Sequence, residues 1–395
     1  MCFRSDKFLC KKSNNNHTKK PTKKTMKRVV FLDYLRIFAC FLVMLVHASE
    51  NFYGGPDSTD MAGATSLLLN ETDRLWVSLY DGFSRMAVPL FVIMSAYLLV
   101  PMKEGENSFS FYKKRFKRIL PPMFAFILFY AFLPLLWGKT DIDTAMGDFY
   151  RTFINFPTLA GHLWFMYPLI GLYLFIPIIS PWLRTCSAKE ERLYLGLFLV
   201  STCIPYLNRW VGEVWGQCFW NEYHMLWYFS GYLGYLIMAH YIRVHLNWSR
   251  SKRFYVGLAC LAAGAFLTIY SFYVQAIPGE LLVTPELEIG WSFCTINCVI
   301  LTAGAFLLFT CIEKESTPAY IRECSDFTYG MYLMHIFWLG MWVGIFKGDM
   351  NLPTVACIPA IAVATFVSCW LSMKVLTPVW GAKWILGAER KLARS

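Results

Sequence analysis

Long apolar blocks constrain the fold of this chain more than any other feature of its sequence. Several runs of about 20 residues are almost free of charge, which is the length that crosses the hydrocarbon core of a bilayer as a helix. Of all residues, 56% are hydrophobic and only 16% are charged, and the mean hydropathy is +0.42. The sequence therefore predicts an all-α, polytopic membrane bundle and excludes an ordinary soluble domain.

We expect about ten transmembrane helices, and the basic residues predict their orientation. The expected spans are 29–49, 81–100, 119–138, 163–183, 193–209, 224–242, 254–275, 289–312, 328–346 and 354–376. The two tails and every second loop hold 30 of the 37 Lys and Arg residues. Basic residues mark the cytoplasmic side, so both termini are predicted to be cytoplasmic. The net charge of +11 thus orients the protein and does not indicate nucleic acid.

The chain divides into one membrane domain and two tails. Residues 1–27 are polar and basic, which predicts a disordered cytoplasmic tail; a translation start at Met26 would shorten it. Residues 28–376 form the expected membrane domain, and residues 377–395 form a C-terminal cytoplasmic tail. The thirteen Cys residues include no CxxC pair, so we expect neither a disulfide framework nor a metal site.

Ionisable residues inside the first span are the strongest functional signal. Such residues are costly in lipid and mark functional sites by default. Arg36 and His47 are eleven residues apart, about 20° around a helix and about 16 Å along its axis, so they share one face. Asp33 lies one turn before Arg36 and can pair with it. The alternative is that Arg36 reaches lipid phosphates and His47 is an interfacial polar residue.

A second cluster of cations precedes the third span. Arg115 and Arg118 occur in "FYKKRFKRILPP", residues 111–122. Guanidinium groups bind phosphate with two hydrogen bonds, so the pair predicts a phosphate site. The alternative is a positive-inside segment that holds anionic lipid.

These motifs resemble the two signatures of the acyltransferase 3 family of integral-membrane acyltransferases. The resemblance spans most of residues 28–376 and includes "AVPLFVIMSAYLL", "GHLWFMYPLIGLYLFIPII" and "FTYGMYLMHIF". Ala96 stands where the family usually has Gly. The segment beginning at His162 is similar to the subgroup of surface-polysaccharide O-acetyltransferases. The resemblance also implies a multi-pass protein of the bacterial inner membrane.

The resemblance implies acyl transfer from cytoplasmic acyl-CoA, usually acetyl-CoA, to a hydroxyl of an envelope polysaccharide or glycolipid. Arg115, Arg118 and Arg36 would bind this donor. His47 would be the general base, because imidazole exchanges a proton near neutral pH. Asp33 would orient or neutralise Arg36. The acceptor sugar, the acyl group and the oligomeric state are left open.

Four further residues are candidates for acceptor binding: His162, Trp164, Arg85 and His335. His162 and Trp164 open the fourth span, although an aromatic belt with a capping His is the alternative. Arg85 stabilises charge near His47 or simply pairs with Asp81. His335 is expected about a third of the way along the ninth span from its inner side, where a helix-to-helix hydrogen bond would also explain it.

A transporter or flippase for lipid-linked sugars is the rival from another class, since it also needs many spans and buried cations. Transporters more often have repeated halves with paired broken helices. Neither feature is visible in this sequence, so the enzyme is favoured.

Overall fold

The computed structural model describes residues 28–52, 64–66, 70–155, 158–216, 221–278, 281–283, 290 and 292–388. The basic tail expected at residues 1–27 and the last seven residues of the C-terminal tail lie outside the described residues. Within residues 377–388, the short helix α15, Ala382–Ile385, packs against α4.

The described part of the chain is almost entirely helical. The first half contains α1 Val30–Glu50, β1 Ala64–Ser66, α2 Glu71–Ser84, α3 Ala87–Leu99, α4 Ser108–Phe132, the 3-10 segment η1 Leu133–Trp137, α5 Ile142–Arg151, the 3-10 segment η2 Thr158–Phe165 and α6 Met166–Thr185. The second half contains α7 Ala188–Ser201, α8 Ile204–Val211, η3 His224–Phe229, α9 Tyr232–Val244, α10 Arg250–Gln275, β2 Leu281–Val283, α12 Ile296–Thr310, α13 Ala319–Val343, the π-helical turn η4 Gly344–Asp349 and α14 Thr354–Leu376. The fold class is therefore all-α, as predicted.

Seven helices in the described residues are long and apolar enough to cross a membrane. They are Val30–Glu50, Glu71–Leu99, Ser108–Trp137, Ala160–Thr185, Arg250–Gln275, Ala319–Asp349 and Thr354–Leu376. Each overlaps one expected span, and several extend well beyond it at the N-terminal end. The second of them is divided into α2 and α3 by a turn at residues 85 and 86.

Three expected spans do not appear as single long helices in the described residues. The span expected at 193–209 is divided into α7 and α8, with Pro205 in the first turn of α8. The span expected at 224–242 begins as η3 and continues as α9 after Gly231, whose φ of 73° favours glycine. In the described part of the span expected at 289–312, the long helix is α12, which has 15 residues. Such breaks depend on local backbone chemistry that hydropathy does not register.

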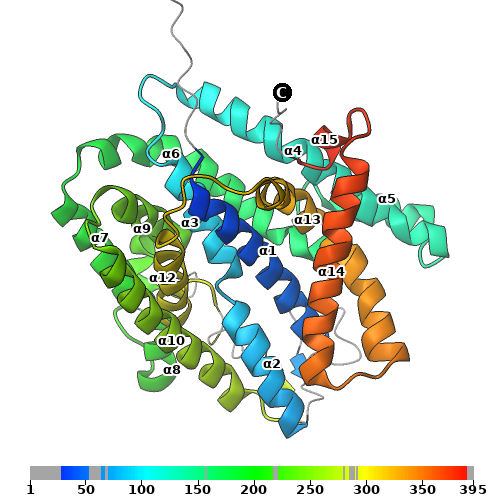
Figure 1. Ribbon diagram of the computed structural model, residues 1–395. Helices are drawn as coiled ribbons and strands as arrows, with labels where there is room; N and C mark the ends of the chain where they lie inside the picture. Colours follow the sequence, from blue (N-terminus) through cyan, green and yellow to red (C-terminus); the bar gives the residue numbers. More distant parts are fainter. Residues whose placement is uncertain are drawn as a thin grey trace, which may run out of the picture.

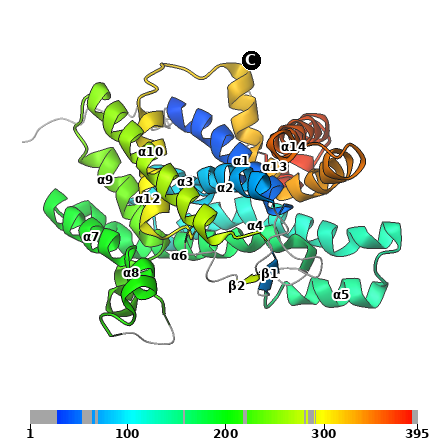
Figure 2. The same cartoon turned by 90° about the horizontal axis from the view of Figure 1, so that it is seen from below.

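Helix α1 runs through the middle of the bundle. It packs against α2, α3, α12, α13 and α14. Figure 1 shows α10 and α12 on one side of α1 and α14 on the other side, and the view from below in Figure 2 shows the same order. Charged residues on α1 therefore face other helices in the bundle, where neighbouring protein groups can solvate them.

Close backbone contact joins α10 and α12, which pack together along much of their lengths. A Cβ atom added at Gly304 would lie 2.3 Å from the backbone nitrogen of Leu261. A Cβ atom added at Gly264 would lie 2.4 Å from that of Leu301. Small residues permit this approach between membrane helices. A short antiparallel pairing of β1 with β2 completes the described fold.

Candidate active site

The two arginine signatures of the sequence meet in one cavity. Arg36 from α1 and Arg115 and Arg118 from α4 all line a cavity of about 160 Å³. Asp326 and Tyr332 from α13 also contribute to its wall. The three guanidinium groups come from helices about 80 positions apart in the chain and surround one cavity. This arrangement suits an anion that carries several phosphates.

Asp33 belongs to the neighbouring network, but Arg36 is not its main partner. Its carboxylate lies 2.6 Å from the guanidinium of Arg28 and 4.0 Å from that of Arg36. The hydroxyls of Thr317 and Ser325 donate to the same carboxylate at 2.6 and 3.0 Å. Asp33 is 1% exposed, so this buried network joins the start of α1 to the start of α13 and the segment before it. Arg28 was not a candidate from the sequence.

Three histidines from separate elements form a cluster farther along the bundle. His47 lies on α1, His162 on η2 and His335 on α13. The ring centroids of His47 and His335 are 5.0 Å apart, and those of His162 and His335 are also 5.0 Å apart. The expected position of His335, a third of the way along its span, is wrong. The helical stretch is Ala319–Asp349 and begins nine residues before the expected start, so His335 lies near its middle, with its ring beside that of His47.

Two ring nitrogens in this cluster have no hydrogen-bond partner among the described residues. They are Nδ1 of His162 and Nε2 of His335, and both atoms are buried. The other nitrogen of each ring is bonded to backbone, that of His162 to the carbonyl of Leu333 at 3.3 Å and that of His335 to the carbonyl of Tyr332 at 2.5 Å. A buried polar atom without a partner is costly, so these two nitrogens indicate a place for water or a ligand.

Tyr332 connects the cavity with the histidine cluster. Its side chain lines the cavity, and its ring centroid lies 5.8 Å from that of His335 and 6.1 Å from that of His162. Its hydroxyl donates to the backbone carbonyl of His162 at 2.5 Å. His47 itself does not line the cavity, but His335 lies between His47 and Tyr332. The arginine-lined cavity and the histidine cluster are therefore adjacent, and Tyr332 contacts both.

Glu50 is a site residue that the sequence analysis did not identify. Its Oε2 lies 2.6 Å from Nδ1 of His47, and its Oε1 lies 3.7 Å from the guanidinium of Arg85. Arg85 also pairs with Asp81 at 2.7 Å, as one of its two interpretations predicted. The signal was present in the sequence, because Glu50 follows His47 by three residues, one helical turn.

Trp164 lies on the same 3-10 segment as His162 but has a different environment. Its indole stacks on Phe293 at a centroid distance of 5.5 Å and an interplanar angle of 19°. Its ring also contacts that of Phe165, at a centroid distance of 6.0 Å. The structure therefore brings His162 and His335 to His47, but it places Trp164 in an aromatic stack with another loop.

This arrangement combines a cationic cavity with an imidazole that has a carboxylate partner. An imidazole held by a carboxylate can accept a proton from a hydroxyl group, and guanidinium groups can hold a phosphorylated donor. Fold and site together define a multi-pass membrane protein with the elements of a group-transfer enzyme.

The chain belongs to the acyltransferase 3 family, since the family's acyltransferase domain matches residues 29–374. The matched segment contains the arginine cavity, Glu50 and all three clustered histidines. Membership implies acyl transfer within the membrane and disfavours the transporter alternative. No curated protein and no solved structure matches the chain significantly.

Proposed function

We propose that the protein transfers an acetyl group from cytoplasmic acetyl-CoA to a hydroxyl of an envelope polysaccharide or glycolipid, at the outer side of a bacterial inner membrane. The observation that carries this proposal is the cavity shared by Arg36, Arg115 and Arg118, whose wall residue Tyr332 contacts the histidine cluster. Membership of the family supports acyl transfer. The acetyl group and the acceptor class rest on the similarity to surface-polysaccharide O-acetyltransferases.

The donor would enter from the arginine side of the bundle. Arg115 and Arg118 hold its phosphates, and Arg36 binds the diphosphate or guides the pantetheine arm. The distribution of Lys and Arg orients this side toward the cytoplasm, with both chain termini inside and about ten spans. The arm then has to cover the axial rise of about 16 Å between Arg36 and His47, which a long flexible thiol carrier is suited to do.

His47 would act as the general base. With its Nδ1 proton donated to Glu50, the lone pair of Nε2 is available to the acceptor hydroxyl. The hydroxyl proton moves to Nε2 as the oxygen attacks the thioester carbonyl. The new carbon–oxygen bond replaces the carbon–sulfur bond, and coenzyme A leaves as a thiolate that takes the proton back from the imidazolium. Glu50 stabilises that imidazolium while it exists.

Acceptor binding would involve the unpartnered nitrogens of His162 and His335. Both atoms are buried next to His47, so a sugar hydroxyl could satisfy them. Arg85 adds positive charge beside Glu50. Trp164 comes from the same segment as His162, and a sugar could contact only the indole face that is not stacked on Phe293.

Thioester turnover tests the proposed chemistry. Purified protein in detergent, supplied with acetyl-CoA, should release free thiol slowly alone and faster when envelope glycolipid is added. The change His47→Gln should abolish the release, whereas Lys113→Ala, on an exposed residue of α4, should leave it unchanged. Turnover that persists in His47→Gln would contradict the role of His47.

Mass spectrometry of envelope glycans tests the acceptor class. Cells that lack the gene should lose one acetyl group per repeat of one glycan, and the wild-type gene should restore it while His47→Gln should not. An identical glycan inventory in both strains would exclude the proposed acceptor without excluding acyl transfer.

A further inference from the structure

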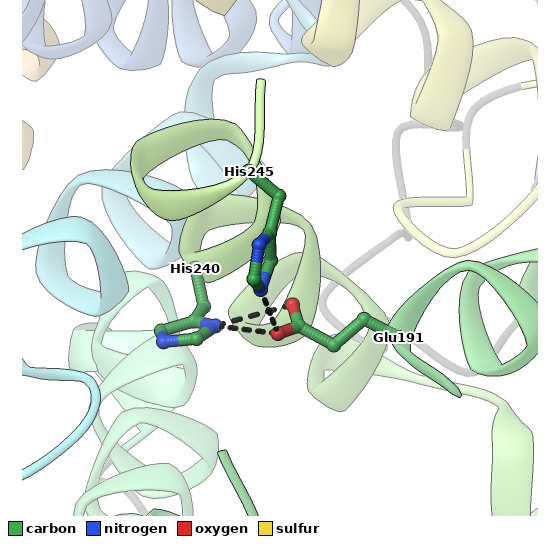
Figure 3. A group of neighbouring side chains, drawn as sticks. All are labelled: Glu191, His240 and His245. Atoms are coloured by element: carbon green, nitrogen blue, oxygen red, sulfur yellow. Dashed lines mark hydrogen bonds and ion pairs between the residues drawn. The ribbon is translucent and has the colours of Figure 1, made fainter. Parts of the chain in front are cut away.

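A second cluster of ionisable side chains lies away from the candidate active site. Glu191 from α7 and His240 and His245 from the end of α9 converge, as Figure 3 shows. The ring nitrogen Nδ1 of His240 lies 3.0 and 3.1 Å from the two carboxylate oxygens of Glu191. Nε2 of His245 lies 2.9 Å from Oε1 of the same carboxylate. Both rings thus direct a nitrogen at one carboxylate.

The cluster is buried and held in place by the ends of its helices. Glu191 is 0% exposed, and the side chains of His240 and His245 are 4% and 23% exposed. A capping box formed by Ser187 and Glu190 fixes the first turn of α7, from which Glu191 projects. Arg243 donates to the backbone carbonyls of Tyr97 and Val100 and so fixes the end of α9 against α3.

These three side chains have the chemistry of a transition-metal site. Two imidazole nitrogens and one carboxylate are a common ligand set for Zn²⁺ and related divalent ions, with water at a further position. One ligand atom from each residue lies within 4.8 Å of the others. Around a tetrahedral ion with bonds of about 2.0–2.1 Å, ligand atoms stand about 3.3 Å apart. The nitrogen-to-carboxylate distances of 2.9–3.1 Å are within a few tenths of an ångström of this value.

We propose that Glu191, His240 and His245 bind one divalent transition-metal ion of the Zn²⁺ class. The ion would join the start of α7 to the end of α9, beside the end of α3. The sequence predicted no metal site, because the ligands come from segments about 50 residues apart and form no short motif. Partial exposure of His245 provides the route by which the ion enters.

Cys186 is adjacent to the proposed site. We expect it to orient the ligand Glu191 and not to bind the ion itself. Its thiol donates to Oε1 of Glu191 at 3.4 Å. This thiol hydrogen bond would orient the carboxylate, as outer partners of metal ligands commonly do.

Zinc binding by the full-length protein in detergent tests the proposal. After removal of metal with a chelator, the protein is incubated with Zn²⁺ and desalted. Bound zinc is measured by elemental mass spectrometry and affinity by competition with a chromogenic chelator. One Zn²⁺ per chain is expected. Loss of an outer partner costs about 10- to 100-fold in affinity, so we expect about tenfold for Cys186→Ala and more than about 100-fold for Glu191→Gln and His245→Gln.

The control is Glu104→Gln, which removes an exposed carboxylate outside the cluster and should bind zinc like the wild type. If the wild-type protein retains no zinc, the three side chains form a hydrogen-bonded triad only, and the proposal is overturned. Equal affinity in Glu191→Gln, His245→Gln and the wild type would place the ion elsewhere and also overturn it. If these variants do not fold, Cu²⁺ bound to the wild type decides: its electron paramagnetic resonance should show coupling to two imidazole nitrogens, and a spectrum without that coupling rejects the site.

Discussion

Nδ1 of His47 lies 2.6 Å from Oε2 of Glu50, one turn farther along the central helix α1. A carboxylate in this position fixes the imidazole tautomer and the ring orientation, and it stabilises the imidazolium formed by proton transfer. The proposed base and its carboxylate partner therefore come from a single helix, and Arg85, at the end of α2, lies 3.7 Å from the same carboxylate.

The change Glu50→Gln should lower kcat for acetyl transfer by about 100-fold, because general-base catalysis contributes about 10²–10⁴-fold and depends on the tautomer. The KM for acetyl-CoA should change little, since the arginine cavity is untouched. Steady-state kinetics in detergent measure both constants. Glu50→Asp should restore part of kcat, and Glu71→Gln, on an exposed carboxylate of α2, should match the wild type. An equal loss in kcat and in acetyl-CoA affinity would argue that Glu50 acts structurally.

The change Arg118→Ala should weaken acetyl-CoA binding by about tenfold or more, because a hydrogen bond to a charged group contributes about 1.5–3 kcal/mol. Equilibrium binding of coenzyme A at several salt concentrations measures the effect, and the salt dependence should become shallower. Lys113→Ala removes the same charge from the same helix outside the cavity and is the control. Equal weakening by both variants would mean that the arginine acts only through the general surface charge.

Asp33→Asn should destabilise the protein more than it weakens donor binding. The carboxylate is buried and holds Arg28 closely, whereas Arg36 lies 4.0 Å away. Breaking a buried ion pair costs about 3–5 kcal/mol. Thermal unfolding in detergent should show a clear fall in Tm, with coenzyme A affinity nearly unchanged in the protein that remains folded. The exposed Asp349→Asn is the control. A loss of coenzyme A affinity without a fall in Tm would instead support the role of orienting Arg36.

Gly304→Val should destabilise the contact between α10 and α12 by about 1–3 kcal/mol or prevent folding, as overpacking does. A Cβ atom there would lie 2.3 Å from the backbone nitrogen of Leu261. The expected readout is a lower Tm and a lower yield of monodisperse protein. Gly171→Val, at a helical glycine with open space around it, should be tolerated. Similar Tm values for the two variants would show that this helix contact is not tight.

Much of the site was predictable because its signals are local. The pairing of Arg36 and His47 on one face follows from helical periodicity, and the Arg115–Arg118 pair follows from spacing. Glu50 was within reach of the same reasoning, at three residues from His47. The length of α13 was not within reach, because polar residues before Phe327 hide its first turns from a hydropathy reading. His335 was therefore expected nearer to the start of its helix than it lies.

The sequence by itself determined that this chain forms a helical membrane bundle, and it singled out the first span as the one with ionisable residues to explain. Tertiary structure alone decided that Arg36 shares a cavity with Arg118, that His162 and His335 meet His47, and that Glu191 meets two histidines. The physical reason is that periodicity constrains residues within one helix. Contacts between helices depend instead on the packing of side chains from segments far apart in the chain.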